Sequence, residues 1–162
     1  MAAYLLDANV LIEAWNHYYR PEFLPGFWTW VDEQQQARTL RTTQSVHAEL
    51  SGDGPLSDWI LARGKGWVVR EDDEATQETF ARIVGFVNSD PRWSPRARAD
   101  FLRGADPWVI AVAAVQGMTI VTLERNDPTT RKKVLIPVVA AEFGVATVNT
   151  FELLRRLGAR LG

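Results

Sequence analysis

The sequence contains no cysteine and only two histidines, which limits the chemistry open to the protein. Without thiols it can form neither disulfides nor thiolate metal sites, and this composition fits a reducing cytoplasm. His17 and His47 have no partner at ligand spacing, so a histidine-based metal site is disfavoured. The sequence also has no G-x-S-x-G elbow, no G-x-G-x-x-G and no phosphate-binding P-loop, so nothing supports serine–histidine hydrolysis, dinucleotide binding or P-loop chemistry.

Long apolar runs and a strong excess of charge are lacking as well. No apolar stretch approaches the roughly 20 residues that span a bilayer, so we expect no membrane segment. No Lys or Arg precedes the first apolar stretch, which Asp7 interrupts, so we expect no signal peptide and a cytoplasmic protein. The formal net charge is −2, so the protein as a whole has no positive potential that would indicate a nucleic-acid partner. Net charge alone does not exclude such a partner.

The length and composition are those of an ordinary globular domain. The chain has 162 residues, of which 46% are hydrophobic and 23% are charged. Such a chain can bury a substantial core, and disorder does not dominate it. We expect a single domain over residues 1–162, with 157–162 as a frayed tail.

Strand-like and helix-like segments alternate along the sequence. Short apolar runs predict strands at 3–6, 39–43, 67–69, 118–122 and 145–148. Helical spacing predicts helices at 8–19, 27–36, 45–50, 56–62, 73–87, 95–102, 107–116, 136–143 and 150–157. Asp106 is expected to cap its helix, with Pro107 at the first helical position. This alternation predicts a three-layer α/β/α domain around a parallel sheet.

Four acidic residues stand where these elements turn toward a common edge of the sheet: Asp7, Glu49, Asp106 and Glu124. In open parallel sheets, sites form beyond the carboxyl ends of the strands, so the four side chains are able to meet. Carboxylates brought together beside apolar segments repel each other until a cation neutralises them. Hard oxygen ligands of this kind suit Mg²⁺ or Mn²⁺.

Several polar residues near these acids are candidates for supporting roles. Asn9, Ser45 and Thr122 could orient Asp7 or a metal-bound water. Arg131, Lys132 and Lys133 follow Glu124 closely and could contact RNA phosphates, although a solvated loop explains them equally well. A second basic group precedes Asp106 and could extend the same rim or merely solubilise a helix: Arg92, Arg96, Arg98 and Arg103.

The ordered set of motifs resembles a PIN domain almost from end to end. The segments that carry the likeness are Leu6-Asp7-Ala8-Asn9-Val10, Val46-His47-Ala48-Glu49-Leu50, Ala105-Asp106-Pro107-Trp108 and Val121-Thr122-Leu123-Glu124. The stretches 16–30 and 133–145 resemble a PIN-like bacterial and archaeal subfamily long described as uncharacterised. The family often has Asp at the fourth position, where this chain has the longer Glu124.

The resemblance implies a Mg²⁺- or Mn²⁺-dependent endoribonuclease that leaves 5′-phosphate and 3′-hydroxyl ends. Asp7 and Asp106 would be the principal metal ligands and catalytic residues, with Glu49 and Glu124 completing the cluster. Many small members are VapC-like toxins of type II toxin–antitoxin modules, so the likeness also implies an RNA substrate, a protein antitoxin and a homodimer.

Other interpretations stay open on the sequence alone. Asp7 and Asp106 could be helix caps, and Glu49 and Glu124 could be ordinary solvated acids. The domain could be a PIN-like binding module without catalysis. A metal-dependent phosphatase of the haloacid-dehalogenase kind is disfavoured because its second acid is Asn9 here.

The aromatic segment between Tyr18 and Trp30 has two possible uses. Most of the seven Trp residues of the chain are expected in the core or an interface. Tyr18, Tyr19, Trp28 or Trp30 could instead stack on bases of single-stranded RNA, or form a dimer or antitoxin surface.

Overall fold

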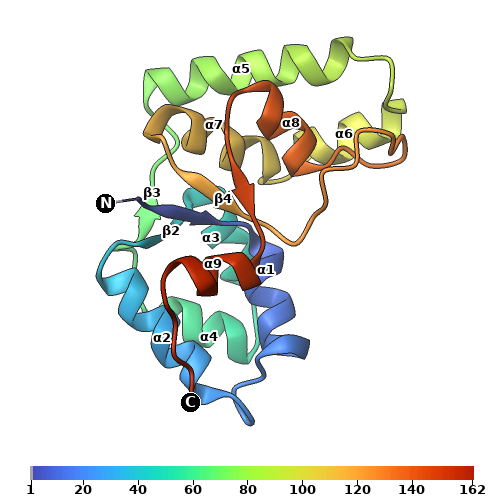
Figure 1. The fold of residues 1–162 in the computed structure, drawn as a ribbon. Helices are drawn as coiled ribbons and strands as arrows, with labels where there is room; N and C mark the ends of the chain where they lie inside the picture. Colours follow the sequence, from blue (N-terminus) through green and yellow to red (C-terminus); the bar gives the residue numbers. More distant parts are fainter. Residues whose placement is uncertain (1) are drawn as a thin grey trace.

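The computed structural model describes residues 2–162 and shows a three-layer α/β/α fold, as the alternation of elements predicts (Figure 1). Its five strands form one sheet in the order β3-β2-β1-β4-β5, and every pairing is parallel. The strands are β1 (Tyr4–Leu6), β2 (Leu40–Thr43), β3 (Val68–Val69), β4 (Thr119–Val121) and β5 (Thr147–Val148). Each strand is predicted from the sequence, although the structure makes each one shorter at its ends.

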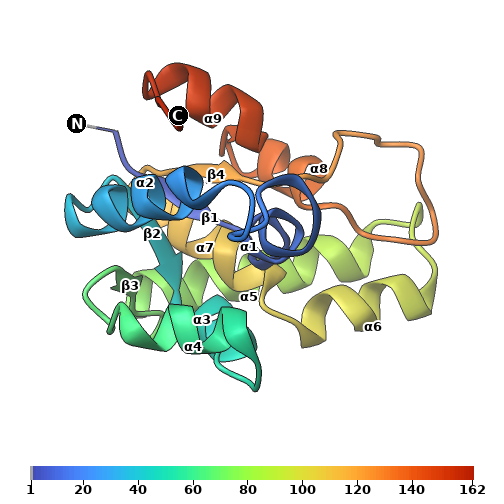
Figure 2. The ribbon, with the colours of Figure 1, turned by 90° about the horizontal axis from the view of Figure 1, so that it is seen from below.

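Nine α-helices and one π-helix connect the strands within the described part of the chain. They are α1 (Ala8–Glu13), the π-helix η1 (Ala14–Tyr18), α2 (Pro25–Gln36), α3 (Gln44–Leu50), α4 (Pro55–Ala62), α5 (Glu74–Ser89), α6 (Pro95–Arg103), α7 (Asp106–Gln116), α8 (Ile136–Glu142) and α9 (Thr150–Arg156). In Figure 1, α5, α6, α7 and α8 lie above the sheet, and α1, α2, α4 and α9 lie below it. Seen from below, α1 and α2 stand in front of the strands, with α9 at one end of the molecule and α4 at the other (Figure 2).

The strands are buried on both faces because helices cover both. Leu5, Ile120 and Val121 have no exposed surface, and Leu6 has 1% exposed. Such continuous apolar strands are typical of parallel sheets. The largest fully buried side chain, Trp67, lies directly before β3. This core fixes the ends of the strands and so the residues that follow them.

The helix predicted for residues 8–19 is wrong in its second half, which is a π-helix. The N–H of Tyr19 donates to the carbonyl of Ala14 at 2.8 Å, a bond that spans five residues. The indole of Trp28 donates to the carbonyl of Tyr19 at 2.6 Å and so holds the end of this turn against α2. A five-residue turn shifts Trp15 and the residues after it out of the register of α1, and such turns are frequent near functional sites.

The tail at residues 157–162 forms no helix or strand, but it folds back on the domain. Leu157, Ala159 and Leu161 pack against the core. A Cβ atom at Gly26 would lie 2.0 Å from the carbonyl oxygen of Leu161, so only glycine permits this close approach. The tail therefore covers the beginning of α2.

Candidate active site

The four acidic residues predicted from the sequence lie at one edge of the sheet. Asp7 directly follows β1, and Glu124 comes shortly after β4. Glu49 lies on α3, which begins where β2 ends. Asp106 begins α7, which leads into β4, so the start of α7 lies at the carboxyl ends of the strands. Strands β2 and β3 extend the sheet on one side of β1, and β4 and β5 extend it on the other. The strand order therefore reverses between β1 and β4, and ligands of open parallel sheets bind at such a topological switch point.

Asp7 is buried and oriented by the neighbouring strand. Its side chain is 4% exposed, and its Oδ2 accepts a hydrogen bond of 3.0 Å from the hydroxyl of Thr122. Asp7 stands at the N-cap position of α1, yet its side chain makes no capping bond. The cap interpretation therefore does not explain this carboxylate, whereas the expected support from Thr122 is present.

Asp106 is not the helix cap that the sequence predicts. The helix begins at Asp106 itself and Ala105 is the cap residue, because the carbonyl of Ala105 accepts from the N–H of Val109. The N–H of Ala105 in turn donates to Oε1 of Glu49 at 3.3 Å. Glu49 is thus tied to the start of α7, although its residue is exposed overall.

Burial and neighbouring negative charges raise the pKa values of Asp7 and Asp106. Burial, followed by the negative charge of Glu124, raises the pKa of Asp7 to about 6. Burial also raises the pKa of Asp106 to about 7, and repulsion from Asp7, Glu124 and Glu49 adds to this effect. An opposite charge nearby would reverse these shifts. The four carboxylates therefore share one electrostatic environment that favours a cation.

Glu124 joins this environment through a loop that closes behind it. Its side chain is only 9% exposed, and its Oε1 accepts a 3.0 Å hydrogen bond from the N–H of Ile136. Its Oε2 lies 2.9 Å from the ammonium of Lys133, but this ion pair lacks hydrogen-bond geometry and the oxygen is otherwise unpartnered. Lys133, predicted as a phosphate contact, thus pairs with an acid of the site.

The donor chemistry suits a hard divalent cation, but the spacing is not that of a closed set of ligands. Across residues 2–162, no group of three or more His, Cys, Asp or Glu side chains converges closely enough to hold a metal ion. The acids nevertheless supply oxygen ligands and repel one another, although Oε2 of Glu124 already pairs with Lys133. The residues therefore fit Mg²⁺ or Mn²⁺ in charge and ligand type, with Asp7 and Asp106 central.

A pocket of about 250 Å³ opens beside Asp106. It is lined by Ala97, Asp100, Phe101, Asp106, Lys132, Lys133 and Val134. Two lysines, Lys132 and Lys133, and two carboxylates, Asp100 and Asp106, thus face the same space, which is large enough for a phosphate group.

Two of the predicted supporting residues do not contact Asp7. Asn9 is exposed on the first turn of α1. Ser45 donates its hydroxyl to Oε1 of Glu71 at 2.7 Å, and its N–H donates to Oε2 of the same side chain at 3.1 Å. Glu71 is 9% exposed and was not predicted. Its place shortly after the strand at Val68–Val69 was the one signal that could have indicated it.

The arginines before Asp106 are engaged with nearby acids. Arg92 forms a two-pronged ion pair with Asp90, and Arg98 donates to the carbonyl of Asp90 at 2.6 Å. Arg96 and Arg103 both pair with Asp100. All four arginines therefore have a polar partner close by, whereas Arg131 and Lys132 are exposed and form no ion pair among the described residues.

Most of the aromatic segment belongs to the core. Trp28 is 4% exposed and Trp30 is 6% exposed. Tyr19 stacks on Phe27, with ring centroids 4.3 Å apart. Tyr18, at 53% exposed, is the one of the four predicted stacking candidates whose ring is open to solvent.

No helix of residues 2–162 is long and apolar enough to cross a membrane. A comparison with curated proteins finds no match. A family model described as "Domain of unknown function (DUF4411)" matches residues 4–161, which include all four acids and both sheet edges. The chain therefore belongs to the DUF4411 family.

Proposed function

We propose that the protein is a Mg²⁺- or Mn²⁺-dependent endoribonuclease. The observation that carries the proposal is the mutual repulsion of Asp7, Asp106 and Glu124, which come from three separate elements and meet at the switch point of a parallel sheet. Asp7 is buried and Asp106 is half-buried, with pKa values raised to about 6 and about 7, and such desolvated acids destabilise the fold when they have no other role. Perturbed acids at the edge of a pocket are typical of functional sites.

The roles of the residues follow from their contacts. Asp7 and Asp106 would hold the cation, and Thr122 fixes the rotamer of Asp7 by its 3.0 Å hydrogen bond. Glu49 and Glu124 would complete the ligand set, directly or through water. A bound divalent ion lowers the pKa of its water and neutralises charge on the phosphate. Lys132 and Lys133 line the pocket beside Asp106 and would bind the phosphate oxygens of RNA.

The wider role rests on the resemblance to PIN domains. The proposal includes hydrolysis that leaves 5′-phosphate and 3′-hydroxyl ends, action as a cytoplasmic toxin, silencing by a protein antitoxin, and assembly as a homodimer. Exposed apolar side chains are available for such partners: Tyr18 and Phe151 pack edge to face with centroids 6.0 Å apart and are both more than half exposed.

A second candidate is a PIN-like binding module without catalysis. The ion pair between Lys133 and Glu124 favours it, because an ammonium at 2.9 Å already offsets part of the negative charge. In such a module Lys133 would stand permanently where a cation acts in the enzyme. The two candidates differ in their response to divalent ions.

The deciding experiment measures cleavage of varied RNAs by the purified protein with Mg²⁺ or Mn²⁺, alongside EDTA, Asp7→Asn and Asp106→Asn. Glu22→Gln is the matched control, because Glu22 is an exposed carboxylate that pairs with Arg20 and lines neither the pocket beside Asp106 nor any part of the acidic edge. Cleavage that is lost with EDTA and in both site variants, but kept in the control, supports the enzyme. Absence of cleavage together with no metal-induced rise in melting temperature would support the binding module instead.

A further inference from the structure

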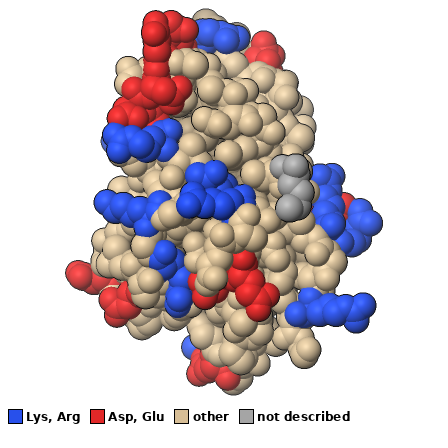
Figure 3. All heavy atoms as spheres, turned by 90° about the vertical axis from the view of Figure 1, so that its left-hand side faces the viewer, with Lys and Arg blue, Asp and Glu red and all other residues tan. Residues whose placement is uncertain are grey.

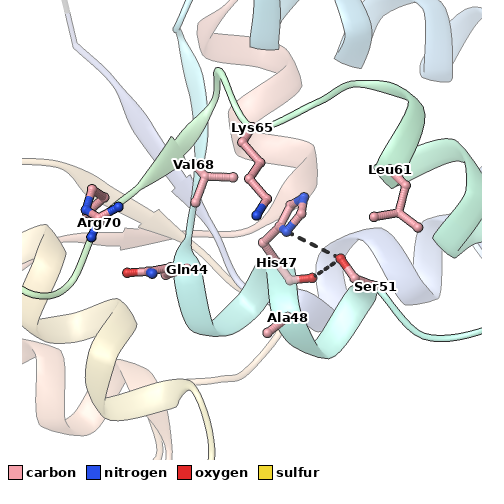
Figure 4. A pocket seen from close by; sticks show the side chains of 8 residues that line it. All are labelled: Gln44, His47, Ala48, Ser51, Leu61, Lys65, Val68 and Arg70. Atoms are coloured by element: carbon pink, nitrogen blue, oxygen red, sulfur yellow. Dashed lines mark hydrogen bonds between the residues drawn. The ribbon is translucent and has the colours of Figure 1, made fainter.

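A second pocket, apart from the acidic edge, lies on the other side of α3 from Glu49. It has a volume of about 590 Å³ and is lined by Gln44, His47, Ala48, Ser51, Leu61, Lys65, Val68 and Arg70 (Figure 4). The first four lie at spacings of three and four residues, so they share one face at α3 and its C-terminal end. Glu49 is not on that face. The pocket is thus separate from the acidic edge.

His47 places an unpartnered nitrogen at this pocket. Its residue is 7% exposed, and its ring lies between Lys65 and Ser51 (Figure 4). The hydroxyl of Ser51 donates to the carbonyl of His47 at 2.6 Å, so it can only accept from Nδ1, which lies 3.3 Å away. A ring with its proton on Nδ1 presents a lone pair at Nε2. This buried Nε2 has no hydrogen-bond partner in the described chain, and such an atom is costly to leave unpaired.

Gln44 supplies the opposite kind of group. Its Oε1 accepts a 3.2 Å hydrogen bond from the N–H of Glu71, which fixes the orientation of the amide. The amide nitrogen of Gln44, with two N–H donors, is therefore left for the pocket. The pocket thus offers a fixed donor in Gln44 and a fixed acceptor in His47.

The mouth of the pocket is positively charged. Lys65 is exposed and has no carboxylate within 4.0 Å among residues 2–162, whereas Arg70 pairs with Asp72. Arg38 and Arg41 lie behind them and donate to the carbonyls of Gly66 and Trp67. Figure 3, which looks at the face with the N-terminus and β3, shows Lys and Arg side chains gathered across its middle. The local excess of positive charge contrasts with the net charge of −2 of the chain.

We propose that this pocket binds a nucleoside monophosphate group, with the phosphate at Lys65 and Arg70 and the nucleoside between Leu61 and Val68. A mononucleotide combines the three features that the lining demands: an anion, an apolar ring face, and N–H or O–H donors for the imidazole acceptor. The cavity of about 590 Å³ is large enough for it. The same group occurs free or within single-stranded RNA, and both sources present the chemistry that the pocket recognises.

The test measures binding by isothermal titration calorimetry in EDTA, so that its outcome does not depend on metal-driven cleavage. The probes are adenosine 5′-monophosphate, adenosine, and a short single-stranded RNA; the protein is the full chain and its Lys65→Met and Lys65→Glu variants. Arg160→Glu is the matched control, because Arg160 is also exposed and forms no ion pair in residues 2–162. Melting temperatures confirm that the variants fold.

We expect the monophosphate to bind at least tenfold more tightly than adenosine. Lys65→Met weakens this binding about tenfold, Lys65→Glu weakens it further, and Arg160→Glu leaves it within twofold. RNA binding that responds to Lys65 while the free monophosphate does not bind assigns the pocket to a nucleotide of an RNA chain. Equal binding of adenosine, binding that survives Lys65→Glu, or absence of binding by both phosphate probes overturns the proposal.

Discussion

The two sides of α3 are opposite in charge and in the way their polar groups are satisfied. On the side of Glu49, carboxylates repel each other, and Lys133 pairs with one of them, Glu124. On the side of His47, Lys65 and Arg70 face a cavity that holds no carboxylate, and the unpaired atom is a nitrogen. One seven-residue helix thus separates a site that favours cations from a site that favours anions.

The difference shows how little the overall charge of this chain says about its partners. The acidic edge arises from the fold, because parallel strands direct the residues that follow them to one side of the sheet. The basic pocket arises at the sheet margin, where the two-residue strand β3 leaves α3 partly uncovered. Four experiments test how far the two sides of α3 differ.

The largest effect is expected from removing charge at the acidic edge alone. Asp106→Asn should lower RNA cleavage at least a hundredfold, which corresponds to about 2.7 kcal/mol or more of transition-state stabilisation. The same variant should bind adenosine monophosphate within twofold of the parent, because Asp106 does not line the basic pocket. Cleavage assays and calorimetry on one preparation measure both. Parallel loss of binding would mean that the two sides of α3 are one site.

A smaller loss is expected from Thr122→Val, which keeps the shape of the side chain and removes both the 3.0 Å hydrogen bond to Asp7 and the 3.2 Å bond that the hydroxyl accepts from the N–H of Glu124. Residues that orient metal ligands typically contribute 10–100-fold to affinity or activity, so we expect divalent-ion affinity, measured by calorimetry, to fall by about that factor. Thr42→Val is the matched control: this hydroxyl is also buried but has no partner, and its removal should leave the protein as stable or about 1 kcal/mol more stable. Equal effects of both variants would contradict the orienting role.

The stability of the metal-free protein should fall as the pH rises. The pKa of Asp106 is raised from 3.8 to about 7 in the folded state, so between these values the folded protein binds more protons than the unfolded chain. The free energy of unfolding therefore decreases through this window; from pH 5 to about pH 6.5 alone the decrease is about 2 kcal/mol, or roughly 4–8 °C in melting temperature. Thermal scans in EDTA from pH 5 to pH 8 measure it. Asp106→Asn should flatten the curve, and Mg²⁺ should raise the melting temperature more at pH 8 than at pH 5; a flat curve for the parent would refute the raised pKa.

The smallest effect is expected from Ser45→Ala. This hydroxyl donates to Glu71 and not to Asp7, so cleavage should stay within twofold while the free energy of unfolding falls by about 1–2 kcal/mol. Urea denaturation measures the second quantity. Ser89→Ala, which removes an exposed hydroxyl bonded to the carbonyl of Phe86, should change stability by less than about 0.5 kcal/mol. A large loss of cleavage in Ser45→Ala would restore its predicted support of Asp7.

The sheet and the place of the acids could be predicted from the sequence because both depend on local pattern. Short apolar runs such as Tyr4–Leu6 mark buried strands, and an acid just after such a run must lie at the carboxyl edge. The confirmed three-layer fold followed from this alternation. Whether the acids hold a metal stays a prediction.

The remaining features depend on contacts between segments far apart in the chain. The pattern of residues 8–19 fits α- and π-turns equally, and the bond from Trp28 to the end of the turn is invisible in it. Ser45 meets Glu71 across 26 residues, and the Nε2 of His47 is left unpaired only by the way Ser51 is engaged. Side-chain pairing of this kind is set by packing, which no local spacing reveals.

The carboxylate of Glu124 also holds together the two ends of a loop. One oxygen accepts from the backbone N–H of Ile136 and the other pairs with the side chain of Lys133. These contacts connect the end of the loop at residues 125–135 to Glu124, where the loop begins. An oxygen of Glu124 that bound a cation would no longer be free to contact Ile136 or Lys133. Under the proposed function, cation binding at the acidic edge would therefore loosen residues 125–135, and proteolysis of this loop would report the occupancy of the site without any substrate being present.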